Sequence, residues 1–318
     1  MKTMKSKFYS LALAAGMLSL TACSDDNTND SNNDKGNGIE NGSTLKGTIT
    51  EDVTLKAGNT YKLSGEYIVE AGATLNIEEG VKIISVYDNI VDYILVKQGA
   101  KINAVGTPDK PIVMTSEKEE PGAWGGIHIC GKAHTNAEGG KGSSEIGGAV
   151  YGGNDDADNS GTLQYIRLEY TGFAFDEEHE ANGISFYGVG NGTIVDHCEA
   201  YKGSDDGFEF FGGSVNVSNM VVVSCSDDSF DWTEGWNGKG TDLVAYQEAK
   251  ATLGYDCDCL IEADNNENDN AATPVSHPVL KNLILAGNGE SKQGIRLRRG
   301  TQADIDNAKA VSYTHLRA

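Results

Sequence analysis

Six carboxylates occupy two short segments of the chain with the same internal spacing. In each segment an aspartate pair is followed three residues later by a further carboxylate, and the second segment starts 22 residues after the first. The six residues are Asp205, Asp206, Glu209, Asp227, Asp228 and Asp231. Carboxylates about 5 Å apart repel one another, and their pKa values rise unless a cation neutralises them. Since a hard, oxygen-coordinated ion such as Ca²⁺ suits such a set, the spacing predicts a calcium site.

The same six carboxylates are also compatible with two roles that need no calcium. An aspartate at a solvent-facing corner can make a local turn through its own side chain, and it then needs no ligand. Alternatively, Glu209 and Asp231 stand one repeat apart, which approaches the ~5 to 5.5 Å separation of the two carboxyl groups in a retaining glycosidase. The choice depends on how the backbone positions these side chains.

The backbone element around the carboxylates is a short repeat: a glycine or serine, an apolar residue, any residue, and a second apolar residue. It occurs at 126–129, 183–186, 207–210, 229–232 and 294–297. Alternation with a period of two indicates strands with one buried face. A spacing of about 22 residues without a helical pattern leaves room for three short strands in each coil. The repeat therefore predicts an all-β protein, a right-handed parallel β-helix of the pectin-lyase type.

Stacked coils would align equivalent residues in columns about 4.8 Å apart. One inward column would hold Ile127, Ile184, Phe208, Phe230 and Ile295. The other would hold Ile129, Phe186, Phe210, Trp232 and Leu297. The column between them would point to solvent and contain His128, Ser185, Glu209, Asp231 and Arg296.

Two long intervals and four Asn-Gly pairs complete the interpretation of the repeat. The intervals 132–159 and 246–278 should be loops that leave the corners of the coils. A β-sandwich stays open as the alternative fold, because Asn-Gly is typical of hairpin turns. Those pairs stand at 41–42, 182–183, 191–192 and 237–238.

The acidic arrangement resembles that of calcium-dependent pectate lyases with a β-helix fold. In those enzymes an aspartate of one coil joins an Asp-Asp-x-x-Asp set of the next, a pattern matched here by Asp205 and then Asp227, Asp228 and Asp231. The resemblance implies a lyase acting on uronate polymers, which also needs a Lys or Arg base on a later coil. The chain departs from the pattern there, since 260–264 reads Leu-Ile-Glu-Ala-Asp. The available substitutes, which could also be surface charges or salt-bridge partners, are Lys239, Lys250 and Arg296.

A longer ordered set of segments resembles a family of secreted β-helix lipoproteins from Gram-negative bacteria. The matching segments are 122–133, 160–170, 205–213, 227–231 and 235–239. The fold of that family is similar to that of pectin lyases, and the family has no established activity. The resemblance therefore implies the architecture and leaves the ligand open.

The N-terminus has the pattern of a lipoprotein export signal. Lysines precede an apolar run that ends in Leu-Thr-Ala before Cys23, so residues 1–22 should be cleaved and Cys23 acylated. The segment 23–44 is rich in Asn, Asp, Ser and Gly and should form a disordered tether. We expect the β-helix at 45–310 to be truncated at its C-terminus, with 311–318 resembling non-native adapter sequence.

The composition limits the partners. The 318 residues include 40 glycines and carry a formal net charge of -22. A phosphate polymer or an anionic membrane would be repelled, so partners should be neutral, cationic or bridged by metal. We expect a monomer without nucleic acid. Five cysteines remain after lipidation; export permits disulfides, but most should be small buried residues.

These features favour a lipid-anchored protein of the outer membrane that faces the cell surface. We expect it to bind a glycan or another cell-surface partner without catalysing a reaction. Trp236, flanked by glycines, is the candidate platform on which a sugar ring stacks. The alternative is a calcium-dependent polysaccharide lyase that cleaves uronate polymers.

Overall fold

The computed structural model describes residues 38–88, 90–175, 179–290 and 293–312. The predicted signal peptide at 1–22, the acylated Cys23, the tether up to residue 37 and the end of the tail at 313–318 lie outside the described residues. Residues 38–44, predicted as the end of the disordered tether, are instead ordered and include a strand at Gly38–Ile39 that pairs with Val53–Leu55. In the described part of the chain, no helix is long and apolar enough to cross a membrane.

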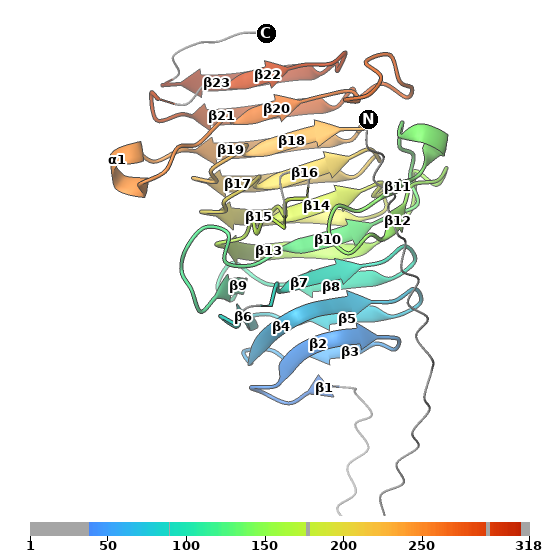
Figure 1. Ribbon diagram of the computed structural model, residues 1–318, viewed down its shortest axis with the longest axis vertical. Coiled ribbons are helices and arrows are strands. Elements are labelled where there is room, and N and C mark those ends of the chain that lie inside the picture. Colours follow the sequence, from blue (N-terminus) through green and yellow to red (C-terminus); the bar gives the residue numbers. More distant parts are fainter. Residues whose placement is uncertain (1–37, 89, 176–178, 291–292, 313–318) are drawn as a thin grey trace, which may run out of the picture. The chain divides into compact units, whose positions relative to one another are not determined.

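Within the described ranges, twenty-one strands form one sheet with parallel pairings (Figure 1). One set of strands runs along a single side of the stack and carries the acidic segments; we call it ladder A. It continues from the C-terminal half of β4 (Thr60–Val69) through β7 (Tyr93–Val96), β10 (Ile127–Cys130), β14 (Ile184–Tyr187), β16 (Phe208–Phe211), β18 (Phe230–Thr233), β20 (Ile261–Ala263) and β22 (Ile295–Leu297).

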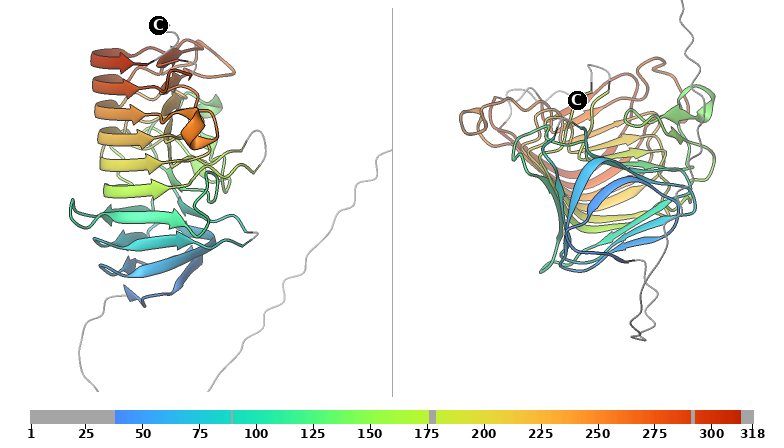
Figure 2. Two further views of the ribbon diagram at one scale, coloured as in Figure 1. Left: turned by 90° about the vertical axis from the view of Figure 1, so that its left-hand side faces the viewer. Right: turned by 60° about the horizontal axis from the view of Figure 1, so that its bottom comes forward.

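The other strands close each coil behind ladder A. In the first coils they are separate strands: β1 (Gly38–Ile39), β2 (Thr44–Ile49), β3 (Val53–Leu55), β5 (Thr74–Ile77), β6 (Lys82–Ser85), β8 (Lys101–Val105) and β9 (Ile112–Ser116). In later coils single long strands replace them: β13 (Gly161–Glu169), β15 (Ile194–Tyr201), β17 (Asn216–Val223), β19 (Lys239–Tyr246), β21 (Val279–Ala286) and β23 (Asp304–Val311). Figure 2 shows these strands stacked coil upon coil.

Each long strand bends at a residue with a left-handed backbone. The φ angles there lie between 51° and 59°, at Tyr165, His197, Asn219, Asp242, Asn282 and Asn307. Asn and Asp tolerate this conformation better than most residues. Their side chains also form a ladder, since Asn307 Nδ2 donates to Asn282 Oδ1 at 2.7 Å and Asn282 Nδ2 to Asp242 Oδ1 at 2.8 Å. The bend turns one strand into two sides of the coil.

The predicted register of ladder A is confirmed. Ile127 pairs with Ile184, Ile184 with Phe208, and Phe208 with Phe230. Between Phe230 and Ile295 lies one more coil, contributed by Ile261. This unbroken parallel ladder excludes the β-sandwich. It also corrects the expectation for 246–278, because this interval contains strand β20 as well as the short helix α1 (Lys250–Leu253).

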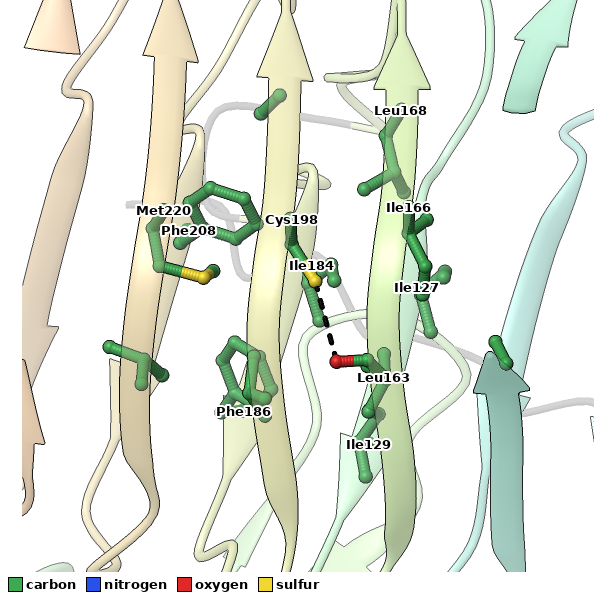
Figure 3. Packing of buried hydrophobic residues seen from close by; sticks show 14 of the residues in the cluster. Ile127, Ile129, Leu163, Ile166, Leu168, Ile184, Phe186, Cys198, Phe208 and Met220 are labelled. Carbon is green, nitrogen blue, oxygen red and sulfur yellow. Dashed lines mark hydrogen bonds between the residues drawn. The ribbon is translucent and has the colours of Figure 1, made fainter. Parts of the chain in front are cut away.

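The core fills the inside of the coils. Ile184, Phe186 and Phe208 are fully buried, and Phe186 stacks on Phe210 with ring centroids 5.1 Å apart. Figure 3 shows these side chains facing Ile166, Cys198 and Met220 from the opposite side of the coil. The five cysteines of the described segments are buried and unpaired, as expected for small interior residues. A rigid, apolar stack thus presents ladder A to the outside.

Candidate functional site

The second aspartate of each pair holds the next coil in place. Asp206 N donates to Asn182 Oδ1 at 3.2 Å, Asp228 N to Asp206 Oδ1 at 2.9 Å, and Cys259 N to Asp228 Oδ1 at 2.7 Å. Each oxygen satisfies a backbone N–H at the start of a ladder A strand, where an unmet N–H would be costly. Asp206 and Asp228 therefore have the local structural role that the sequence left open as an alternative.

The six carboxylates lie close enough for their charges to raise pKa values within the set, but they divide among three smaller groups and do not form one ligand set. Oxygens of Asp206, Glu209 and Asp231 lie within 4.8 Å of one another, and Asp206 shares a second such group with Asp205 and Asp227. Asp228 instead groups with the side chains of Cys259 and Glu262. Asp228 Oδ1 accepts the hydrogen bond from Cys259 N, so this carboxylate faces the coil that contains Cys259.

A hard cation could be held by the group of Asp205, Asp206 and Asp227 or by the group of Asp206, Glu209 and Asp231. The second group includes two residues that line the cleft described below. All three donors are carboxylate oxygens, the ligand type that Ca²⁺ prefers. Burial raises the pKa of Glu209, and the charges of Glu145 and Asp231 raise it further. Burial likewise raises the pKa of Asp231, with a further rise from Glu262 and Asp264. Protons or a cation must therefore relieve the charge of this group.

A cleft of about 670 Å³ opens on the outer side of ladder A beside this group. Its floor includes Glu209, Asp231 and the rings of Tyr187 and Phe211, which stack with centroids 4.5 Å apart. One wall comes from the segment around β11 (Gly142–Ser143) and β12 (Val150–Tyr151), and the other from 264–268 and the end of β22. The interval 132–159, predicted only as a loop, thus builds one side of the cleft.

Two glutamates of the cleft are held by hydroxyl groups. Tyr151 Oη donates to Glu234 Oε2 at 2.8 Å, and Thr135 Oγ1 donates to the same oxygen at 2.7 Å. Tyr187 Oη reaches Glu145 Oε2 at 3.4 Å. Burial raises the pKa of Glu145 to about 7. Near neutral pH, Glu145 can therefore either donate or accept a proton in a hydrogen bond to a ligand.

Arg298 and Arg299 line the cleft, and both are paired with carboxylates. Arg298 makes a bidentate contact with Asp264, with Nε–Oδ1 and Nη2–Oδ2 both at 2.9 Å, and it also contacts Glu262. Arg299 Nη1 lies 2.7 Å from Asp264 Oδ2. Burial alone would lower the pKa of Arg298, but the hydrogen bond and charge of Asp264 outweigh it and the pKa is raised. A guanidinium held in this way keeps its proton.

Of the three candidate bases, two are paired with carboxylates and one is exposed. Arg296 Nη1 lies 2.6 Å from Glu262 Oε1, and Lys250 Nζ lies 2.6 Å from Asp256 Oδ1, so both are salt-bridge partners. Lys239 is exposed at the start of β19 and does not line the cleft. Arg298 was not predicted, although it stands two residues after Arg296 and so projects from the same side of β22.

The column between the inward residues is aligned as predicted, but part of it does not reach solvent. His128 and Ser185 are fully buried. Ile146, Ala149 and Tyr151 pack over this side of ladder A in an apolar cluster of their own, together with Cys130 and Tyr187. Burial lowers the pKa of His128 to about 4, so its ring is neutral.

Trp236 does not form the predicted sugar platform. It is 1% exposed, stacks on Phe210 with ring centroids 4.1 Å apart, and donates from Nε1 to Val215 O at 3.2 Å. The flanking glycines serve close packing, since a Cβ on Gly238 would lie 1.9 Å from Val215 O. The indole therefore belongs to the core and has no face open to a ligand.

Comparison with known proteins agrees with this architecture. The family model for the pectate-lyase-like beta helix domain matches residues 47–315. The chain therefore belongs to the pectate-lyase-like β-helix family. A search of curated proteins gave no match.

Proposed function

We propose that this protein is a lipid-anchored glycan-binding protein that holds a sugar chain in the cleft of ladder A without cleaving it. The observation that carries the proposal is the cleft itself: a walled site of about 670 Å³, rich in carboxylates, hydroxyls and guanidinium groups, on the outer side of a rigid coil. Sugar hydroxyls both donate and accept hydrogen bonds, so this lining suits them.

The charge of the lining favours a neutral sugar chain. Among the described lining residues, six carboxylates face two arginines, and both arginines are already paired. A polyuronate would meet net negative charge unless a cation intervened. We place a calcium ion at Asp206, Glu209 and Asp231, where it would relieve the repulsion at the cleft floor.

Binding is tested on the full chain in detergent by affinity electrophoresis and calorimetry with soluble xylan, mannan and β-glucan. We expect retention by a neutral polysaccharide and about tenfold weaker binding for Glu209→Gln, which keeps the side-chain shape. The matched control is Glu78→Gln, an exposed position on the first coils. Equal binding by both variants and the parent would refute the cleft as the site.

Calcium is tested separately by titration of the same chain with Ca²⁺. We expect heat for the parent and for Glu78→Gln, and a much weaker signal for Glu209→Gln. No heat for the parent would remove the calcium site while leaving glycan binding to its own test.

A uronate lyase is the second candidate, favoured by the presence of Arg298 beside Asp231 at the cleft. A lyase base must lose its proton, however, and the pairing of Arg298 with Glu262 and Asp264 opposes this. We expect no ultraviolet absorbance from unsaturated products when the protein is incubated with polygalacturonate and Ca²⁺. Calcium-dependent product formation would establish the lyase instead.

We propose that acylated Cys23 tethers the β-helix to the outer membrane, facing outward as a monomer. The sequence pattern before Cys23 supports this part of the proposal. Metabolic labelling with palmitate should mark the parent and spare Cys23→Ser. Surface proteolysis of intact cells should release the β-helix, and full protection would contradict surface display.

A further inference from the structure

A second surface feature lies on the outer side of the first coils. Three large apolar side chains are well exposed there: Tyr87 at 67%, Ile90 at 60% and Phe175 at 45%. We call them the aromatic shelf. Ile90 borders two grooves, one of about 630 Å³ shared with Phe175 and one of about 360 Å³ shared with Tyr87. Single exposed apolar residues are ordinary, but a gathered set beside grooves marks a contact surface.

Buried rings link the aromatic shelf to the floor of the cleft, beneath the apolar cluster of Ile146, Ala149 and Tyr151. Ring contacts lead from Phe175 to Tyr93 at 6.5 Å, from Tyr93 to His128 at 6.1 Å, and from His128 to Tyr187 at 6.1 Å. Tyr187 then stacks on Phe211, and both line the cleft. Since β7 and β14 are two inter-strand steps apart, the two features are separated along the stack by about 10 Å.

Residues 174–175 and 179–180 pair with each other and border both features. Phe175 N donates to His179 O at 2.9 Å, and Ala174 forms an isolated antiparallel bridge with Glu180. Phe175 lines the shelf groove, whereas His179 lines the cleft. The contact between Phe175 and His179 therefore brings an edge of the shelf groove beside an edge of the cleft.

We propose that the aromatic shelf is a second contact for the sugar chain held in the cleft, with sugar rings stacked on Phe175 and Tyr87. This inference rests on the proposed glycan binding. A sugar ring has an apolar face and a polar edge, and the Phe175 groove offers both kinds of surface. Beside the ring stands the pair of Tyr93 Oη and Glu66 Oε2, 3.0 Å apart. A stable protein interface needs about 800 Å² from each partner, which three side chains do not supply.

The test measures affinity against chain length by calorimetry on the full chain in detergent. The probes are disaccharides and hexasaccharides prepared from xylan, mannan and β-glucan. We expect Phe175→Ala and Tyr87→Ala each to weaken hexasaccharide binding roughly three- to tenfold, the effect of one lost aromatic contact. Disaccharide binding in the cleft should stay unchanged. The matched control is Ile284→Ala, a position 50% exposed on β21.

The outcomes separate the two proposals. A parent chain that binds no saccharide would overturn the proposed function and this inference together. A parent that binds, with Phe175→Ala and Tyr87→Ala equal to Ile284→Ala, would overturn the shelf alone. Loss of self-association in sedimentation, with unchanged hexasaccharide affinity, would also overturn it and assign the surface to contacts between copies of the chain.

Discussion

The first coils and the later coils share one backbone plan but differ on the outside of ladder A. In the first coils the core is mainly aliphatic, with Leu55, Leu63 and Leu75 fully buried beside Tyr61 and Tyr67. Their ion pairs are exposed, as in Lys56–Glu78, where the two side chains are 50% and 40% accessible. In the later coils stacked aromatic rings fill the core, and the partners of Arg298 are almost fully buried.

The difference shows that the geometry of the coil alone does not form a binding site. What the later coils add is a set of insertions at the corners, 132–159 and 264–278, which wall off ladder A and lower the polarity around its carboxylates. The inward column is simply repeated, whereas the outward column changes from coil to coil. We therefore expect substitutions of outward-facing residues to change ligand binding. In the later coils, stability should respond to substitutions of inward-facing and outward-facing residues alike.

The largest expected difference between the first and the later coils is the loss of unfolding free energy when an ion pair is broken. Arg298→Gln removes one of the two arginines that contact Asp264 and one of the two that contact Glu262, whose side chains are 7% and 10% accessible. We expect a cost of about 3 kcal/mol, the lower end of the range for a broken buried pair, because Arg299 and Arg296 still compensate part of the charge. Lys56→Gln breaks an exposed pair and should cost less than about 1 kcal/mol. Denaturant unfolding of both variants checks this, and equal unfolding midpoints would show that the two regions do not differ in this way.

Loss of the hydrogen bond from Asp228 N to Asp206 Oδ1 should have an intermediate effect on the free energy of unfolding. Asp206→Ala removes the acceptor of the buried Asp228 N–H and should cost about 1 to 3 kcal/mol. Asp206→Asn keeps an acceptor oxygen, as Asn182 does naturally one coil earlier, and removes a buried charge. Its unfolding midpoint should lie close to that of the parent. If Asn were as destabilising as Ala, the carboxylate charge and not its acceptor role would matter at this position.

The protonation of Glu145 should have the smallest effect on the free energy of unfolding. Its pKa is about 7 in the fold against 4.5 for an exposed glutamate, so the folded chain binds more protons between these values. The stabilising contribution is complete below about pH 4.5 and is lost as the pH rises through about 7. After allowance for solvent screening of this half-buried group we expect about 1 kcal/mol. The difference in unfolding free energy between parent and Glu145→Gln, followed against pH, isolates this loss from that of the other carboxylates; a flat difference would contradict it.

The coil could be predicted from the sequence because its register is local. Alternating residues such as those of β16 and β18 fix which side chains point inward, and stacking then aligns Phe208 with Phe230. The cleft could not be predicted from the alternation of residues in this way. Glu145 and Tyr151 reach it from an insertion without periodicity, so nothing in their spacing indicates their position.

Errors arose where one residue type serves opposite purposes. Glycines beside Trp236 suggested an open ring, yet they allow backbone to approach the buried indole. Aspartate pairs suggested six equivalent ligands, yet the backbone uses one member of each pair for its own hydrogen bonding. Only contacts between coils distinguish these cases.

The central claim is that a glycan binds on the later coils of ladder A. Hydrogen–deuterium exchange of the full chain, with and without a neutral hexasaccharide, tests it most directly. We predict added protection at 142–151, 208–211 and 264–268, and none in β3 and β5 of the first coils. Protection confined to those first strands, or unchanged exchange throughout under saturating sugar, would contradict the claim.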